Sequence, residues 1–331
     1  MAPEILTEQR NIHQKITQGV AELYARFPFP SRGVPVDYYL NKFKDTIGSR
    51  KTFRLLDAGC GTGEMTVAAA LRYPEATVVG CDLSQASLTQ AHALAERTGA
   101  KNATFFQQDL VAPLPYAERF DYIFCIGVLH HLASPETGLR HLVEALSEDG
   151  KMLLYLYGVL GRQELILKRE ILALLEKDPL DFESKIDCAR RLDLYQFPRS
   201  GLLNILAEVL TSPPRASWKR LKERWIWKKT LKGQRQWQAS NFEEIILADQ
   251  LAHPQVVHYR IKEIFQLLEG VGLRLVKMVD GMPDDLSEAI RSPEVLQRVR
   301  HLSVLERYQL NELMSKPENY TFVAERNHAG R

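Results

Sequence analysis

The chain has 331 residues, of which 45% are hydrophobic and 25% are charged, and its formal net charge is +2. This composition is typical of a globular protein with a sizeable core, and the near balance of charges implies no steering by the whole molecule. The first twenty residues lack the apolar run of a signal peptide, and no stretch reaches the ~20 apolar residues of a membrane-spanning helix. We therefore expect a cytoplasmic protein without membrane insertion.

The four cysteines give no sign of a redox or metal centre. Cys60, Cys81, Cys125 and Cys188 form no C-x-x-C pair, and none has a histidine at metal-ligand spacing. Three of them fall in or beside apolar strand candidates, where a thiol behaves as a small hydrophobic group. We expect neither disulfides nor a bound metal.

The first half of the chain alternates between helix and strand patterns. Apolar residues spaced by three or four predict helices over 5–26 and 37–47, with a break at Pro28 and Pro30. Strands are then predicted at 53–58, 77–81, 103–106, 122–126 and 151–157, and helices at 63–72, 84–98 and 136–146. Such alternation with continuous apolar strands is typical of a parallel sheet covered by helices on both faces.

After Gly158 the pattern becomes helical. Helices are predicted at 162–177, 182–194 and 202–210, then a helix at 261–269, a strand at 273–279, a helical insert over 284–315 and a last strand at 319–325. We interpret the chain as one α/β domain in three parts. An N-terminal helical lid (1–50) precedes a core (51–158 and 259–331), and a helical cap (159–258) is inserted after the fifth strand.

The strongest local signal is a glycine-rich loop after the first strand, Asp57-x-Gly59-x-Gly61-x-Gly63. Glycines permit a tight turn and a close approach of the backbone to a ligand. The spacing differs from the G-x-G-x-x-G of NAD-binding proteins, because Glu64 stands where the third glycine would be and would face a pyrophosphate with like charge. The loop therefore suits a ligand without phosphates, and a dehydrogenase is disfavoured.

An acidic residue follows at the end of the second strand. Asp82 comes nineteen residues after Gly63. A carboxylate at this place can accept hydrogen bonds from both hydroxyls of a ribose. The alternative is that Asp82 caps the following helix, although Ser84 can do so as well.

Five segments in register resemble the motifs of class I S-adenosylmethionine-dependent methyltransferases. They are residues 56–63, 80–84, 106–110, 120–132 and 146–151, the last resembling the turn into the fifth strand. The resemblance covers residues 53–157, with a weaker match through 245–325. It implies a Rossmann-like, seven-stranded, mostly parallel sheet in the order 3-2-1-4-5-7-6, with the seventh strand antiparallel.

The resemblance also implies S-adenosyl-L-methionine as cofactor and S-adenosyl-L-homocysteine as product. Asp57 and Gly59 would hold the methionine amino group, Asp82 the ribose and Asp109 the adenine amine, with Leu83 and Leu110 on either side of the ring. The predicted cofactor-binding residues are Asp57, Gly59, Cys60, Gly61, Gly63, Asp82, Leu83, Gln108, Asp109, Leu110, Ile126 and Gly127.

Methyl transfer from a sulfonium is an in-line displacement, so alignment of the acceptor is the enzyme's main task. An oxygen or nitrogen acceptor can also need a general base. The resemblance places the exit loop of the fourth strand beside the methyl group, which makes His130 and His131 the candidate catalytic residues. The alternative is that one of them shapes the loop by bonding to the backbone.

The predicted acceptor pocket combines lid, strand and cap residues. They are Tyr24, Phe27, Phe29, Tyr157, His253 and Tyr259. Tyr155 and Tyr157, near the end of the fifth strand, can face the cleft or pack in the core. Asp249 and Gln250 also lie where the cap returns to the core, and Asp249 is a further candidate base.

The class of acceptor stays open at this point. The turn Gly127-Val128-Leu129-His130 lacks the Asn/Asp-Pro-Pro-Tyr/Phe pattern of enzymes that methylate exocyclic amines of bases. Residues 211–240 hold nine basic residues, one acid and all four tryptophans, as in an amphipathic cap helix or a polyanion-binding surface. We expect a small-molecule acceptor, which can be anionic. The alternatives are a protein or RNA docked on residues 211–240, nucleic acid being the less favoured partner, and a non-catalytic S-adenosylmethionine-binding protein.

Overall fold

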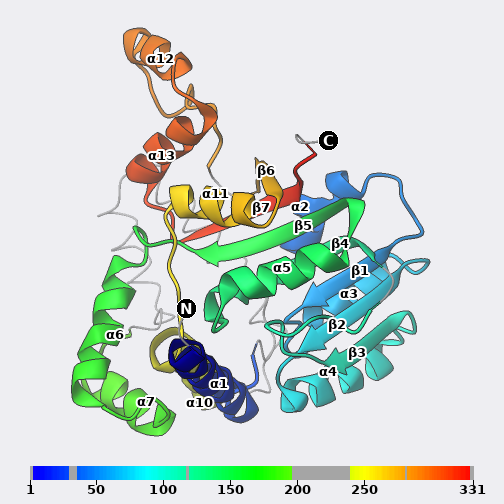
Figure 1. Ribbon diagram of the computed structural model, residues 1–331, viewed down its shortest axis with the longest axis vertical. Helices are drawn as coiled ribbons and strands as arrows, with labels where there is room; N and C mark the ends of the chain where they lie inside the picture. The colour runs from blue at the N-terminus through cyan, green and yellow to red at the C-terminus, as the bar shows by residue number, and fades with distance from the viewer. Residues whose placement is uncertain (1–2, 30–35, 117–118, 196–238, 280–281, 329–331) are drawn as a thin grey trace.

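The computed structural model of the chain describes residues 3–29, 36–116, 119–195, 239–279 and 282–328. Its centre is a seven-stranded sheet in the order β3-β2-β1-β4-β5-β7-β6 (Figure 1). The strands are β1 (Arg54–Ala58), β2 (Thr77–Asp82), β3 (Ala103–Gln107), β4 (Phe120–Ile126), β5 (Leu146–Tyr157), β6 (Leu273–Met278) and β7 (Asn319–Arg326). β7 is antiparallel to β5 and β6, and the other pairs are parallel. The predicted sheet, its order and its antiparallel seventh strand are confirmed.

The helices follow the sequence pattern closely. They are α1 (Pro3–Arg26), α2 (Val36–Ile47), α3 (Glu64–Arg72), α4 (Gln85–Thr98), α5 (Pro135–Ala145), α6 (Gln163–Leu175), α7 (Phe182–Arg191), α10 (Ala239–Leu247), α11 (Ile261–Gly270), α12 (Pro293–Arg300) and α13 (Val304–Ser315). The insert predicted over 284–315 thus contains two short helices, and α12 projects away from the sheet (Figure 1). The predicted helix 202–210 and residues 211–238 of the basic segment lie outside the described residues. None of the described helices has the length and apolar character to cross a membrane.

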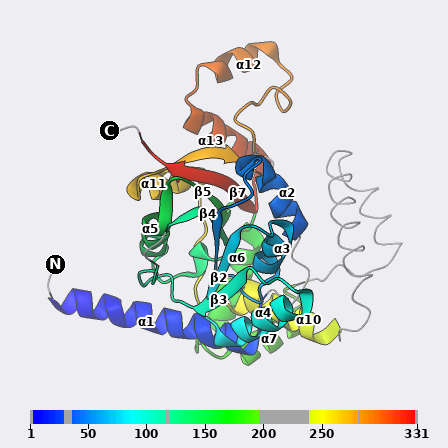
Figure 2. The ribbon, with the colours of Figure 1, turned by 90° about the vertical axis from the view of Figure 1, so that its right-hand side faces the viewer.

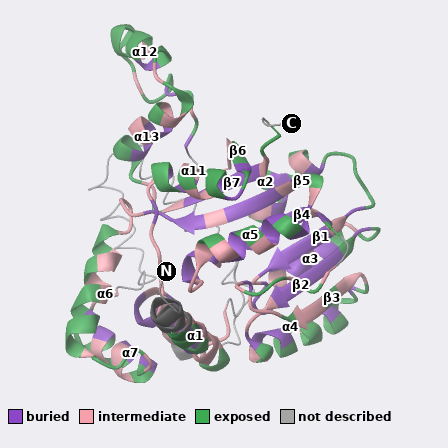
Figure 3. Ribbon diagram, in the orientation of Figure 1, coloured by how far each residue is buried: buried purple, intermediate pink, exposed green. Residues whose placement is uncertain are grey.

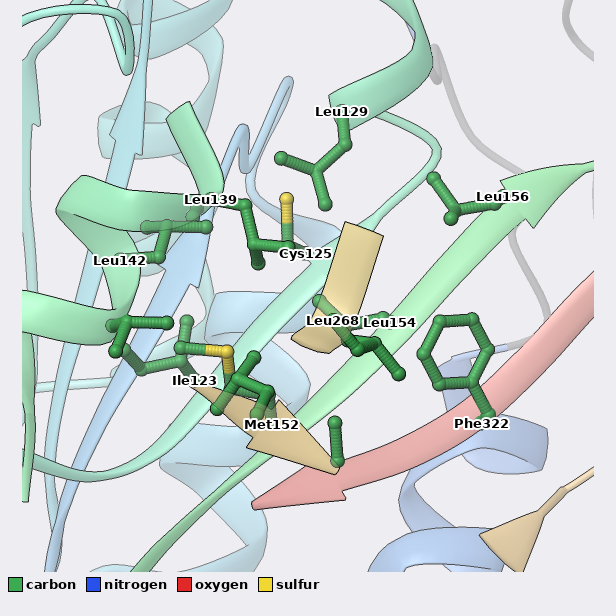
Figure 4. Close-up of a cluster of buried hydrophobic side chains, with 14 of the residues drawn as sticks. Ile123, Cys125, Leu129, Leu139, Leu142, Met152, Leu154, Leu156, Leu268 and Phe322 are labelled. Atoms are coloured by element: carbon green, nitrogen blue, oxygen red, sulfur yellow. The ribbon is translucent and has the colours of Figure 1, made fainter. Parts of the chain in front are cut away.

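Alternate residues of the strands supply two hydrophobic layers, because successive strand side chains point to opposite faces. Tyr122 and Phe124 of β4 pack in the layer that α2 and α3 cover, whereas Ile123 and Cys125 pack on the other face, under α5 and α11. Figure 4 shows the second layer, and Figure 3 shows the buried strands between exposed helix faces. α2 is therefore part of the packing of the sheet, since its Phe43 is fully buried there.

One local prediction is wrong. Residues 146–151 were expected to form a turn, but they begin β5. Leu146 pairs with Phe120 and Lys151 pairs with Tyr122. The extra residues of β5 between these two pairs form a bulge, and the pairing with β4 continues on both sides of it. The polar run from Ser147 to Gly150 resembles a turn in sequence because a bulge leaves its residues unpaired.

A third hydrophobic cluster joins α1 to the helices that follow β5. It contains Leu23 of α1, Leu172 of α6, Phe182 of α7 and Leu251 of the π-helical turn η2 (Ala248–Ala252). The approach is close at Gly19, where an added Cβ would lie 2.8 Å from Leu180 Cδ2. Figure 2 shows α1 alongside α4 and α7, beneath the sheet. This packing brings the N-terminal helix to the same side of the sheet as the segment inserted after β5.

Candidate active site

A cavity of about 410 Å3 lies at the carboxyl ends of β1, β2, β4 and β5. Open α/β sheets bind their ligands at this edge. We call one part the loop end, defined by Asp57, Gly59, Gly61, Asp82 and Asp109. We call the other the tyrosine end, defined by Tyr24, Tyr155, Tyr157, Arg162 and Asp249. All ten residues line the same cavity.

The glycine loop is held against the end of β2. The backbone N–H groups of Gly59 and Cys60 both donate to the Cys81 carbonyl, at 2.8 and 2.9 Å. Gly59 has φ +78°, and a Cβ there would lie 2.3 Å from Val128 Cγ2. A residue other than glycine would therefore be strained in its backbone and would collide with the exit loop of β4.

Asp82 faces the cavity rather than capping a helix. Its carboxylate accepts hydrogen bonds from the backbone N–H groups of Gly61 (2.9 Å) and Ser84 (2.8 Å). Ser84 is the N-cap of α4, because its side chain accepts from the Ser87 N–H. Asp82 thus holds the glycine loop in place, and Ser84 rather than Asp82 caps the helix.

Asp57 is the most deeply buried acid of the loop end, with 3% of its surface exposed. Burial raises its pKa to about 7, against the opposing effect of a hydrogen bond from Thr66 Oγ1 at 2.6 Å. The charges of Asp82 and Glu64 raise this pKa further. Three acids thus face one ligand position, and such a site favours a cation.

The remaining predicted cofactor residues gather at the loop end, with one exception. All the others line the cavity: Gln108, Asp109 and Leu110 after β3, Leu83 after β2, Ile126 at the end of β4 and Gly127 after it. Gly63 does not line it. Its N–H donates to the Cys60 carbonyl at 2.9 Å, and a Cβ there would lie 2.6 Å from Ala91 Cβ, so Gly63 serves the packing of α3 on α4.

A chain of hydrogen bonds crosses the tyrosine end. The Tyr24 hydroxyl donates to Asp249 Oδ1 (3.1 Å), and Gln250 Nε2 donates to Asp249 Oδ2 (2.6 Å). Arg162 Nη1 in turn donates to Gln250 Oε1 (2.8 Å). Asp249 is buried, and burial raises its pKa. The π-helical turn η2 supplies both Asp249 and Gln250, and such turns are frequent at functional sites.

The two candidate histidines take different positions. His131 lines the cavity, and its Nδ1–H donates to the Gln255 carbonyl at 2.9 Å. His130 does not line it, because its ring stacks on Tyr157 at 3.8 Å between centroids. Burial lowers the pKa of His131 to about 3 and that of His130 well below its ordinary value, so both rings are neutral near pH 7.

Three predicted acceptor-pocket residues line the cavity and three do not. Tyr24, Phe29 and Tyr157 line it. Phe27 packs in the third hydrophobic cluster, and His253 stacks on His131 with 3.8 Å between ring centroids. Tyr259 is buried in the sheet core, where its backbone pairs with Tyr157. Phe27, His253 and Tyr259 therefore pack behind the residues that line the cavity and do not line it themselves.

Several wall residues carry no sequence motif. Tyr39 of α2, Arg162, and Ile245 and Ile246 of α10 line the cavity without having been predicted, and Tyr155 faces it. For Arg162 a signal existed, since it follows β5 at the edge where parallel sheets bind ligands. Tyr39 and the two isoleucines come from helices whose distance from the sheet the sequence does not give.

Comparison with known proteins agrees with this geometry. A methyltransferase-domain family matches residues 49–185. An uncharacterized protein of Synechococcus sp. is 31% identical over 318 residues, which cover 90% of this chain and 69% of that protein. A ubiquinone biosynthesis O-methyltransferase of Pseudomonas syringae pv. tomato is 30% identical over 144 residues, 40% of this chain and 58% of that enzyme.

A solved structure shares the fold. PKMT2 from Rickettsia typhi in complex with AdoHcy aligns with a TM-score of 0.61 and 14% identity, over 89% of this chain and 53% of that one. The chain thus spans little more than half the length of this structure and of the Pseudomonas relative. With the sheet order, the glycine loop and the matched domain together, the chain belongs to the class I S-adenosylmethionine-dependent methyltransferases.

Proposed function

We propose that this methyltransferase transfers its methyl group to a small-molecule acceptor bound at the tyrosine end of the cavity. The observation that carries the proposal is the continuity of the cavity from Asp82 to Asp249 within about 410 Å3. Small-molecule sites commonly measure ~300–1,000 Å3. Since the loop end must hold the cofactor, the remaining space suits a small acceptor better than a folded one.

The residues of the loop end fit S-adenosylmethionine. The acids Asp57 and Asp82 match an ammonium group and a ribose diol, and Leu83 and Leu110 offer apolar surface to an adenine ring. When bound, this cofactor supplies an electrophilic methyl group on a sulfonium. The sulfonium charge is also compatible with the tyrosine rings beyond the loop.

We assign proton removal to Asp249. An acceptor hydroxyl or amine that receives the methyl group must lose a proton, and Asp249 would accept that proton. Burial raises the pKa of this carboxyl, which makes it a stronger base than an exposed carboxylate. His131 lines the same cavity, but a pKa of about 3 makes its ring a weak base. We therefore place it, with His130, in the support of the wall.

The lid and cap would complete the site. Tyr24 of α1 meets Asp249 of η2 directly, so residues from 1–50 and 159–258 close the tyrosine end from two sides. We propose that opening requires this contact to break, which gives the acceptor its path.

Transfer of labelled methyl groups tests the proposal. Purified protein would be incubated with methyl-labelled S-adenosylmethionine and a cell extract, and the mixture then separated by ultrafiltration. We expect label in low-molecular-weight products of the filtrate, and loss of that label with Asp249→Asn while S-adenosylhomocysteine affinity stays within about two-fold. Label confined to retained protein or RNA would refute a small-molecule acceptor, and absence of any transfer would favour a non-catalytic binding protein.

A further inference from the structure

Arg162 places a fixed positive charge at the tyrosine end. It directly precedes α6 and comes five residues after Tyr157, the end of β5. Its guanidinium carbon lies 3.4 Å from the centroid of the Tyr157 ring. Nη1 donates to Gln250 Oε1 at 2.8 Å, and Nε donates to the Glu318 carbonyl at 3.0 Å. Stacking and two hydrogen bonds therefore hold the guanidinium in one orientation.

This charge has no direct counter-ion among the described residues. Within the described ranges no ion pair joins the Arg162 guanidinium to an Asp or Glu. Its hydrogen-bond partners there are Gln250 Oε1, the Glu318 carbonyl and the Tyr155 hydroxyl, all of them uncharged. Asp249 is reached only through Gln250, and its two oxygens already accept from Tyr24 and Gln250. A guanidinium has five N–H donors, so donors are left for a ligand.

A second guanidinium adds positive charge near the tyrosine end. Arg169 is half-buried behind η2 and donates to the carbonyls of Gln250 and His253. Burial lowers its pKa to about 10, which still leaves it charged at pH 7. The charges of both arginines thus act on the Asp249 carboxyl. A site of this kind favours an anionic group on the acceptor.

The walls around Arg162 are flat and largely apolar. Rings of Tyr24, Tyr39, Tyr155 and Tyr157 line this part of the cavity, with Phe29 beside them. Tyr155 lies edge-on to both Tyr39 and Tyr157, at 6.5 and 5.9 Å between centroids. Such walls suit a planar, unsaturated ligand body.

We propose that Arg162 binds a carboxylate of the methyl acceptor, so that the acceptor is a small planar carboxylic acid carrying a hydroxyl or amine. The inference rests on the proposed function, because it assumes that the acceptor occupies the tyrosine end. A guanidinium matches a carboxylate with two parallel N–H···O bonds. Anchoring the acid at Arg162 leaves the other end of the acceptor free to reach Asp249.

Binding alone tests the role of Arg162, without turnover. Protein saturated with S-adenosylhomocysteine would be titrated calorimetrically with benzoate and 4-hydroxybenzoate, each beside its neutral amide. We expect the acids to bind about ten-fold or more tightly than the amides, as a charged hydrogen bond contributes. Arg162→Gln should abolish the preference for the acids over the amides. Arg162→Lys should retain part of this preference, because lysine keeps the positive charge but cannot form the two parallel hydrogen bonds of a guanidinium.

The matched control is Arg140→Gln, which removes an exposed arginine of α5 that pairs with Glu136. It should leave the preference unchanged, and all variants should keep S-adenosylhomocysteine affinity within about two-fold. Equal binding of acid and amide to the unaltered protein, failure of both acids to bind, or a preference that survives Arg162→Gln would overturn the role of Arg162. Failure of the proposed function would show separately, as methyl label in macromolecules.

Discussion

Asp57 should make cofactor binding depend on pH near neutrality. The carboxyl has a pKa of about 7 in the free protein, raised from 3.8 by burial and then by the charges of Asp82 and Glu64. If Asp57 holds the cofactor's amino group, the bound form must be the carboxylate. Binding then requires that a proton leave the site at any pH below about 7.

The magnitude follows from this pKa. With a pKa of about 7, the free carboxyl is about ten to one protonated at pH 6 and about one to ten at pH 8. Affinity is therefore fully present above pH 7 and is lost as the pH falls through it, by about ten-fold between pH 8 and pH 6. That factor corresponds to about 1.4 kcal/mol.

Calorimetric titration with S-adenosylhomocysteine at pH 6, 7 and 8 measures this effect. At pH 6 the binding enthalpy should also vary with the ionisation enthalpy of the buffer, because a proton is released. Asp57→Asn, which can still accept from Thr66, should remove both effects. Equal affinity at pH 6 and pH 8 would refute the reasoning. An unchanged pH dependence in Asp57→Asn would move the titrating group to Asp82, whose pKa burial also raises.

Three further substitutions test the loop and the fold. Asp82→Ala should weaken S-adenosylhomocysteine binding about ten-fold or more, since it removes the acceptor of the Gly61 N–H together with the proposed ribose contact. Unchanged affinity in the same titration would show that Asp82 is not part of the cofactor site. Gly59→Ala should also lower the affinity for S-adenosylhomocysteine. Adding Val128→Ala should restore part of that affinity, because the new Cβ collides first with Val128 Cγ2. Unchanged affinity in Gly59→Ala alone would contradict the predicted collision. Glu312→Ala should lower the free energy of unfolding in urea by about 3–5 kcal/mol, since Arg260, the Ile261 N–H and the Tyr320 hydroxyl lose their shared acceptor. As a control, Glu136→Ala at an exposed position should change the free energy of unfolding little. Similar losses of stability in Glu312→Ala and Glu136→Ala would contradict the proposed importance of the buried Glu312.

The fold could be predicted because the strands are continuous apolar runs. Both faces of β1, β4 and β5 are covered, so alternate residues such as Tyr122 and Ile123 are equally buried and the runs stand out from the amphipathic helices between them. The start of β5 could not be predicted. Its residues from Ser147 to Gly150 are polar and lie in the bulge between the pairs Phe120–Leu146 and Tyr122–Lys151, so no apolar run marks them as strand.

The two ends of the cavity differ in how far the sequence reveals them. The loop end comes from strand ends and the turns that follow them, so Asp57, Asp82 and Asp109 lie at fixed distances along the chain from apolar runs. Among the predicted cofactor residues, Gly63 alone does not line the cavity, because spacing alone does not separate a glycine needed for ligand approach from one needed for helix packing. The histidine pair shows the same limit, since adjacent His130 and His131 lie on different sides of the wall.

The tyrosine end is assembled from segments that share no local pattern. Tyr24 comes from α1, Tyr39 from α2, Arg162 from the start of α6 and Asp249 from η2. Their meeting depends on the third hydrophobic cluster, in which Leu23 and Leu251 pack α1 against η2. A change in that packing can alter the tyrosine end without changing any motif of the loop end. Under the proposed function, Arg162 and Asp249, rather than the glycine loop, are therefore the residues whose substitution should redirect acceptor choice.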